Sequence, residues 1–131
     1  MMGKQLMIKK YIRLTFSIYG KADCFHISKD TVRMLGYPNY ICLKIKNNNA
    51  LVILPSEAKE VMSFIIPKNL FSSSSGQFRV TSKSFVTEIL TQNNLSKDKT
   101  YLISGKYSEK ENAVFFNINN AKIFHNFKNK N

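Results

Sequence analysis

The stretch Phe25-His26-Ile27-Ser28-Lys29-Asp30-Thr31-Val32-Arg33-Met34-Leu35-Gly36 decides the expected fold class, because it joins a strand to a short helix and then ends that helix. Its first residues, with Cys24 before them, predict a short strand. Ser28 is the expected N-cap of a helix that carries Val32 and Leu35 on one face. Gly36 stands at the C′ position, where a glycine ends many helices.

Strands are expected on both sides of this element. Tyr11 to Tyr19 alternates apolar and polar residues, which is typical of a half-buried strand. Tyr40 to Lys46 and Leu51 to Leu54 flank three consecutive asparagines, residues that tolerate positive φ. These two segments therefore predict a hairpin with a tight loop.

The second half of the chain repeats this order of elements. It predicts strands over Val61 to Ile66 and Gln77 to Val80, a helix from Lys83 to Gln92 capped by Thr81 or Ser82, and a hairpin of Thr100 to Tyr107 with Ala113 to Ile118. We expect a β-rich α+β fold in which two strand-helix-hairpin units, 11–56 and 61–124, share the core of one compact domain, 1–131. The alternative is that the same elements recur by chance.

The first unit resembles the AbrB/SpoVT looped-hinge (swapped-hairpin) family of DNA-binding proteins. The family signature runs approximately I-P-K-x-x-R-x-x-L-G and continues into a hairpin that ends near a proline. Corresponding places are taken here by Ile27, Lys29, Leu35, Gly36 and Pro55.

The departures from the signature fall on two positions and on the tandem arrangement. Ser28 replaces the family proline, and Val32 stands at the arginine position, with Arg33 one residue later, about a quarter turn around a helix. Two units in one chain resemble the tandem members of the family, although neither unit has their D-x-x-x-R signature. The resemblance implies a pseudo-symmetric AbrB-like barrel whose face with the hinge loops and basic residues meets DNA.

The charge of the chain points to an acidic partner. Lys and Arg number 20 against 8 Asp and Glu, a formal net charge of +12, and such an excess attracts polyanions. We therefore expect a nucleic-acid-binding protein, with DNA preferred over RNA, that regulates transcription. The candidate binding residues are Arg13, Lys29, Arg33, Lys44, Lys46, Arg79, Lys83, Lys99 and Lys106.

Three of these cations, Arg13, Lys44 and Lys46, are expected to line one sheet surface because they alternate with apolar residues along strands. Phosphate contact needs such outward-facing positive groups. The alternative is that they are ordinary solvated side chains. The tyrosines likewise have two interpretations, stacking on unpaired bases or packing in the core.

No catalytic, metal or cofactor motif stands out in the sequence. His26 and His125 have no partner at a useful spacing, and no glycine-rich phosphate loop occurs. Cys24 and Cys42, without a C-x-x-C pair, are expected to be buried free thiols in a reducing compartment. We expect a protein that is not an enzyme and has no cofactor.

The remaining expectations concern location and partners. No stretch approaches the roughly 20 apolar residues of a membrane span, so the chain is expected in the cytoplasm with no membrane partner. A homodimer is one expected assembly. The rival hypothesis is a small phage or mobile-element protein that inhibits a host defence or nucleic-acid enzyme, and so binds a host protein, or that captures a signalling nucleotide.

Overall fold

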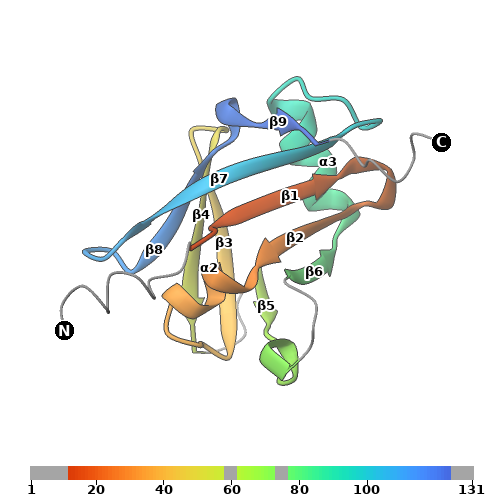
Figure 1. Cartoon of the computed structure of the whole chain (residues 1–131). Helices are drawn as coiled ribbons and strands as arrows, with labels where there is room; N and C mark the ends of the chain where they lie inside the picture. Colours follow the sequence, from red (N-terminus) through yellow and green to blue (C-terminus); the bar gives the residue numbers. More distant parts are fainter. Residues whose placement is uncertain (1–11, 58–61, 73–76, 125–131) are drawn as a thin grey trace, which may run out of the picture.

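The computed structural model describes residues 12–57, 62–72 and 77–124 (Figure 1). Within these ranges nine strands and two α-helices follow one another along the chain. In order they are β1 (Thr15–Tyr19), β2 (Cys24–Ser28), α2 (Lys29–Met34), β3 (Tyr40–Lys46), β4 (Ala50–Ser56), β5 (Ser63–Ile65), β6 (Gln77–Thr81), α3 (Lys83–Gln92), β7 (Thr100–Ser108), β8 (Ala113–Asn117) and β9 (Lys122–Ile123). Short 3-10 turns η1 (Gly20–Ala22), η2 (Leu70–Ser72) and η3 (Ile118–Asn120) connect some of them.

The strands form a nearly closed antiparallel barrel, which confirms the β-rich α+β class. Their order is β5-β3-β4-β8-β7-β1-β2-β6, with β9 added beside β7. β7 is long enough to pair with β1 along its first half and with β8 along its second. We call β9, the first half of β7, β1, β2 and β6 the front wall, and β5, β3, β4, β8 and the second half of β7 the back wall (Figure 1).

The predicted hairpins and the second helix are confirmed. β3 pairs with β4 across the asparagine loop, where Asn47 and Asn48 have positive φ. α3 covers the predicted residues, and the Ser82 side chain caps it by accepting a hydrogen bond from the Phe85 N–H. The helix α2 ends at Met34 with Leu35 as its C-cap, and Gly36 follows at the predicted C′ position with a φ of 87°.

Two predicted strands are shorter than expected. β1 begins at Thr15, and the predicted Tyr11 lies outside the described residues. β5 begins at Ser63, and the predicted Val61 also lies outside them. The chain just before β1 still contacts the barrel, because the Leu14 carbonyl oxygen accepts a hydrogen bond from the Gly105 N–H at 2.7 Å.

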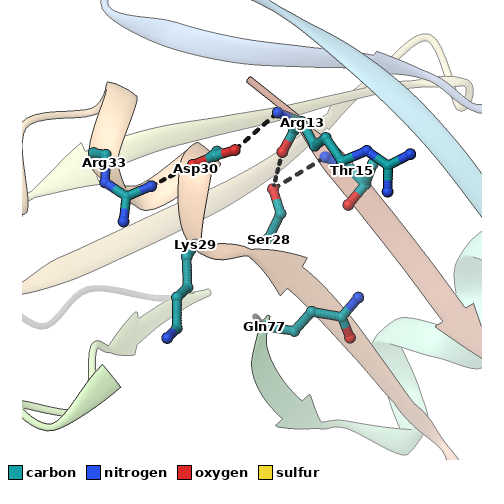
Figure 2. A pocket seen from close by; sticks show the side chains of 7 residues that line it. All are labelled: Arg13, Thr15, Ser28, Lys29, Asp30, Arg33 and Gln77. Atoms are coloured by element: carbon teal, nitrogen blue, oxygen red, sulfur yellow. Dashed lines mark hydrogen bonds and ion pairs between the residues drawn. The ribbon is translucent and has the colours of Figure 1, made fainter. Parts of the chain in front are cut away.

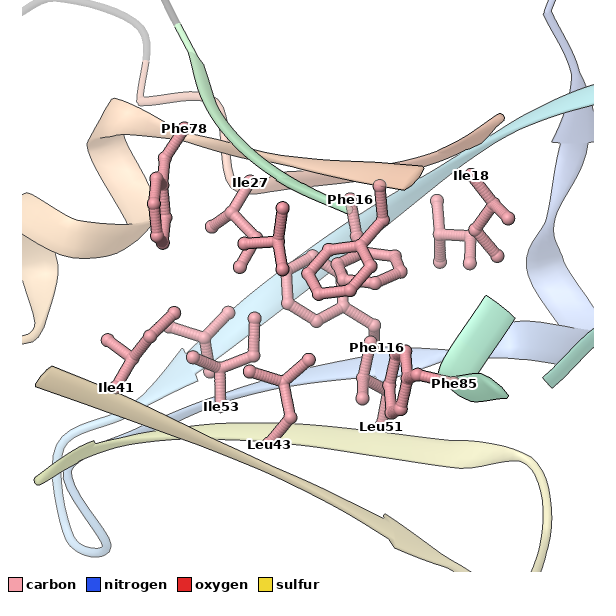
Figure 3. Packing of buried hydrophobic residues seen from close by; sticks show 14 of the residues in the cluster. Phe16, Ile18, Ile27, Ile41, Leu43, Leu51, Ile53, Phe78, Phe85 and Phe116 are labelled. Carbon is pink, nitrogen blue, oxygen red and sulfur yellow. The ribbon is translucent and has the colours of Figure 1, made fainter. Parts of the chain in front are cut away.

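The core lies between the two walls and draws on both halves of the chain. Alternation along the strands sends apolar side chains inward, as expected for a pleated strand. The Phe16 ring of β1 lies 5.0 Å from the Phe25 ring and 5.7 Å from the Phe116 ring of β8, measured between centroids. Figure 3 shows Phe16, Phe116 and neighbouring aliphatic side chains in the space between the walls.

Three further observations concern the cysteines, membrane-spanning helices and metal-binding clusters. Cys24 and Cys42 are both buried and free. In the described ranges no helix has the length and apolar character needed to cross a membrane. Nor does that part of the chain gather three or more His, Cys, Asp or Glu side chains as a metal site would need.

Candidate anion-binding groove

A pocket of about 430 Å³ opens where the start of β1, the helix α2 and the start of β6 meet. We call it the basic pocket. Its lining consists of Arg13, Thr15, Ser28, Lys29, Asp30, Arg33 and Gln77 (Figure 2). With Arg13, Lys29 and Arg33 against the Asp30 carboxylate, the formal charge of the lining is +2.

Ser28 fixes the chain before β1 in place. Its hydroxyl donates to the Arg13 carbonyl at 2.7 Å and accepts from the Thr15 N–H at 3.1 Å. The Thr31 hydroxyl, 2.9 Å away, then supplies a further hydrogen bond to Ser28 Oγ. This single side chain therefore continues the pairing of β2 with β1 past the end of the strand.

The predicted N-cap position of Ser28 is confirmed, but its side chain makes no capping hydrogen bond. The reason is competition, since the hydroxyl already bonds the backbone of Arg13 and Thr15.

Asp30 contacts both Arg13 and Arg33, two of the residues that line the pocket. Its Oδ2 accepts a hydrogen bond from the Arg13 backbone N–H at 2.8 Å, and its Oδ1 forms an ion pair with the Arg33 guanidinium (Figure 2). The Arg33 guanidinium also lies over the Phe71 ring, 5.2 Å from its centroid. Arg33 is therefore held from two sides while about half of its side chain, 47%, stays exposed.

A second cavity, about 420 Å³, adjoins the basic pocket on the outer face of the front wall. We call it the polar groove. Its floor comes from alternate residues of β1 and β7, namely Thr15, Ser17, Tyr19, Leu102 and Ser104, and its rim includes Ile12 and Phe124. Both cavities share Arg13, Thr15 and Gln77, so they adjoin at these residues, and we call the two cavities together the groove.

Neighbouring side chains hold the floor of the polar groove. The Tyr19 ring packs on the His26 ring, with centroids 4.4 Å apart. His26 Nδ1 in turn is hydrogen-bonded to Gln77 Oε1. This chain of contacts crosses β1, β2 and β6 and fixes the floor without any contribution from a ligand.

Four of the nine predicted binding residues lie at or beside this groove. Arg13, Lys29 and Arg33 line the basic pocket. Arg79 is exposed on β6, opposite His26 and two residues after Gln77, so it shares their outward face. Residues distant in sequence are thus brought to one side of the barrel.

The other five predicted residues lie elsewhere. Lys44 and Lys106 lie at the two ends of a row of paired residues that crosses the back wall, and Lys46 is exposed beside that row. The row is Lys44, Val52, Phe115 and Lys106. Lys83 is exposed at the start of α3 and Lys99 just before β7.

The expected common surface for Arg13, Lys44 and Lys46 is therefore wrong. In the strand order β4, β8 and β7 separate β3 from β1, so Lys44 and Lys46 face away from the groove. Alternation predicted that these side chains point outward but could not say on which wall, because that depends on pairing between distant strands.

Several groove residues were missing from the predicted set. The alternating pattern of β1 places Thr15 and Ser17 on the outer face, which was a usable signal. Gln77 gave no signal, because a lone glutamine at a strand start is unremarkable. Phe124 follows the short strand β9, which had not been predicted.

Comparison of the chain with protein-family models, with curated proteins and with solved structures finds no match.

Proposed function

We propose that this chain is a non-enzymatic nucleic-acid-binding protein of the cytoplasm that prefers DNA over RNA and acts as a transcriptional regulator. The observation that carries the proposal is the convergence of Arg13, Lys29 and Arg33 on one pocket, beside the exposed Arg79. Arginine and lysine are the side chains that contact phosphate groups in nucleic-acid complexes. Arginine also offers a planar fork that fits phosphate oxygens.

The overall charge supports the same proposal. A formal charge of +12 raises the local concentration of any polyanion around the protein. The cations of the back wall contribute to this long-range attraction, whereas those of the groove make the short-range contacts. Buried free thiols at Cys24 and Cys42 support a reducing compartment such as the cytoplasm.

The strand order supports an AbrB-like tandem architecture. When β1, β2, β3 and β4 are exchanged with β5, β6, β7 and β8 respectively, the pair β1·β7 becomes β5·β3, and β3·β4 becomes β7·β8, pairs that occur. The pairs β4·β8 and β2·β6 map onto themselves. The pair β1·β2 would map onto β5·β6, which are not paired among the described residues. We therefore propose two related units with exchanged hairpins and one open seam.

The residues at and just after the position of the family arginine also support this architecture, with the arginine one residue later in the helix. Val32, at that position, is fully buried, and Arg33, one residue later, lines the basic pocket. A shift of one residue turns a helical side chain by about 100°, which separates an inward position from an outward one. In this chain the phosphate-contacting role is therefore proposed for Arg33.

The test is binding of a fluorescently labelled nucleic acid as a function of salt. For duplex DNA, each neutralised phosphate makes the slope of log affinity against log salt more negative by about 0.9. Engagement of Arg13, Lys29, Arg33 and Arg79 predicts a slope of about −3.6, or a loss of about a hundredfold between 50 mM and 200 mM salt. A matched RNA is expected to bind more weakly.

Absence of binding to DNA and RNA at about 50 mM salt, where electrostatic affinity is high, would contradict the proposal. The favoured function would then be inhibition of a host nucleic-acid enzyme through protein contact. A slope near zero in the presence of binding would equally contradict a phosphate-based interface.

A further inference from the structure

We propose, building on the proposed function, that the two adjoining cavities of the groove take an unpaired stretch of nucleic acid, with a phosphate in the basic pocket and its base in the polar groove. The bases of a duplex are stacked and paired. A concave site beside the phosphate contacts can therefore accept a base only from a strand in which that base is unpaired. Recognition of unpaired strands combines a positive groove with aromatic surfaces for the bases.

The dimensions and the division of chemistry along the groove support this inference. The two cavities measure about 430 and 420 Å³, each within the range of about 300–1,000 Å³ usual for ligand pockets. The cations gather at one end, at Arg13, Lys29 and Arg33, whereas the polar groove adds hydroxyl groups and apolar rims. A nucleotide has the same division into an anionic end and a flat, polar-edged ring.

Ser17 contributes a hydroxyl group to the polar groove. It belongs to β1 and lines the floor of the groove beside Thr15. A hydroxyl both donates and accepts, so it suits the edge of a base or a sugar oxygen.

The rim of the groove provides surfaces for stacking. Phe124 is 45% exposed and Ile12 is 54% exposed, and both line the polar groove. The Phe124 N–H donates to the Thr100 carbonyl at 2.7 Å, which fixes the aromatic residue beside the start of β7. An exposed, anchored aromatic ring in a cavity that adjoins a cationic pocket suits a base whose phosphate lies in that pocket.

The test measures binding of a 5′-labelled single-stranded oligothymidylate and of a duplex of the same length by fluorescence anisotropy at about 50 mM salt, a condition of strong electrostatic binding. We expect the single strand to bind more tightly than the duplex. Phe124→Ala should weaken single-strand binding by about five- to a hundredfold, the range found for loss of one base–aromatic stack. Duplex binding should change by less than about twofold, because phosphate contacts alone remain.

The control variant is Ile65→Ala. Ile65 is an exposed apolar residue of β5, on the back wall and outside the groove, so its truncation should leave both affinities unchanged. Ser17→Ala is a second groove variant, and it should also weaken single-strand binding selectively. Thermal melting of each variant verifies the fold.

The outcomes separate this inference from the function on which it rests. Duplex binding at least as tight as single-strand binding, together with no effect of Phe124→Ala or Ser17→Ala, would overturn the inference and leave the proposed function standing. Failure of both nucleic acids to bind would overturn both. If thymidine monophosphate binds as tightly as the oligonucleotide, the groove captures a free nucleotide, and the strand proposal is overturned.

Discussion

Replacement of Gly105 by alanine should destabilise the barrel through one contact. Gly105 lies on β7 opposite Phe116 of β8, on the inner face. A Cβ atom at this position would lie 2.6 Å from a carbon of the Phe116 ring, about 0.9 Å short of the roughly 3.5 Å at which carbon atoms pack. The Phe116 ring is almost fully buried and already contacts Phe16, so it has little room to move.

The magnitude follows from the cost of overpacking a core, about 1–3 kcal/mol. An unfolding entropy of about 2.1 cal/mol/K per residue gives roughly 275 cal/mol/K for 131 residues. A loss of 1–3 kcal/mol then lowers Tm by about 4–11 °C.

Circular dichroism melts of the wild type, Gly105→Ala, Phe116→Leu and the double variant measure this contact. Leucine at position 116 removes the ring that the new methyl group meets. Phe116→Leu should therefore lower Tm less in the Gly105→Ala background than in the wild type. A Gly105→Ala protein that melts within about 1 °C of the wild type would refute the reasoning, because overpacking of this size lowers Tm measurably.

Three further results are expected. Ser28→Ala should lower the free energy of unfolding by about 1–3 kcal/mol in a denaturant titration, because the Arg13 carbonyl and the Thr15 N–H lose their hydrogen-bond partner. An unchanged midpoint of the titration would contradict this. Cys24 and Cys42 should react slowly with a thiol reagent in the native state but fully in denaturant without reductant, and absence of free thiol would refute the cytoplasmic proposal. Asp30→Asn should keep an acceptor for the Arg13 N–H while it removes the negative charge from the basic pocket. The repulsion between this carboxylate and a phosphate about 4 Å away is roughly 1 kcal/mol in water, so affinity for an oligonucleotide at low salt should rise about fivefold. Weaker binding would contradict the electrostatic account.

Local elements of the fold could be predicted because local chemistry determines them. The asparagine loop between β3 and β4 and the Ser82 cap of α3 depend on residues close in sequence. Alternation likewise separated inward from outward side chains along β1.

The groove itself could not be predicted, because it depends on contacts between distant segments. Gln77 meets Arg13 and Lys29 only through the pairing of β6 with β2. Ser28 illustrates the same limit, since its position indicated a cap while the neighbouring chain before β1 engaged its hydroxyl. The wall on which Lys44 lies also follows from strand order and has no local signal.

The central claim is that nucleic acid binds to the front-wall groove and not to the positive surface in general. It is tested most directly by comparing Arg13→Gln/Arg33→Gln with Lys44→Gln/Lys46→Gln, two variants that remove the same charge from opposite walls. For a single-stranded oligonucleotide, loss of two phosphate contacts should reduce the salt slope by about 1.4 in the groove variant, with a matching loss of affinity. The back-wall variant should keep a slope close to that of the wild type. Equal reductions in the two variants, or a larger one for the back wall, would contradict the account.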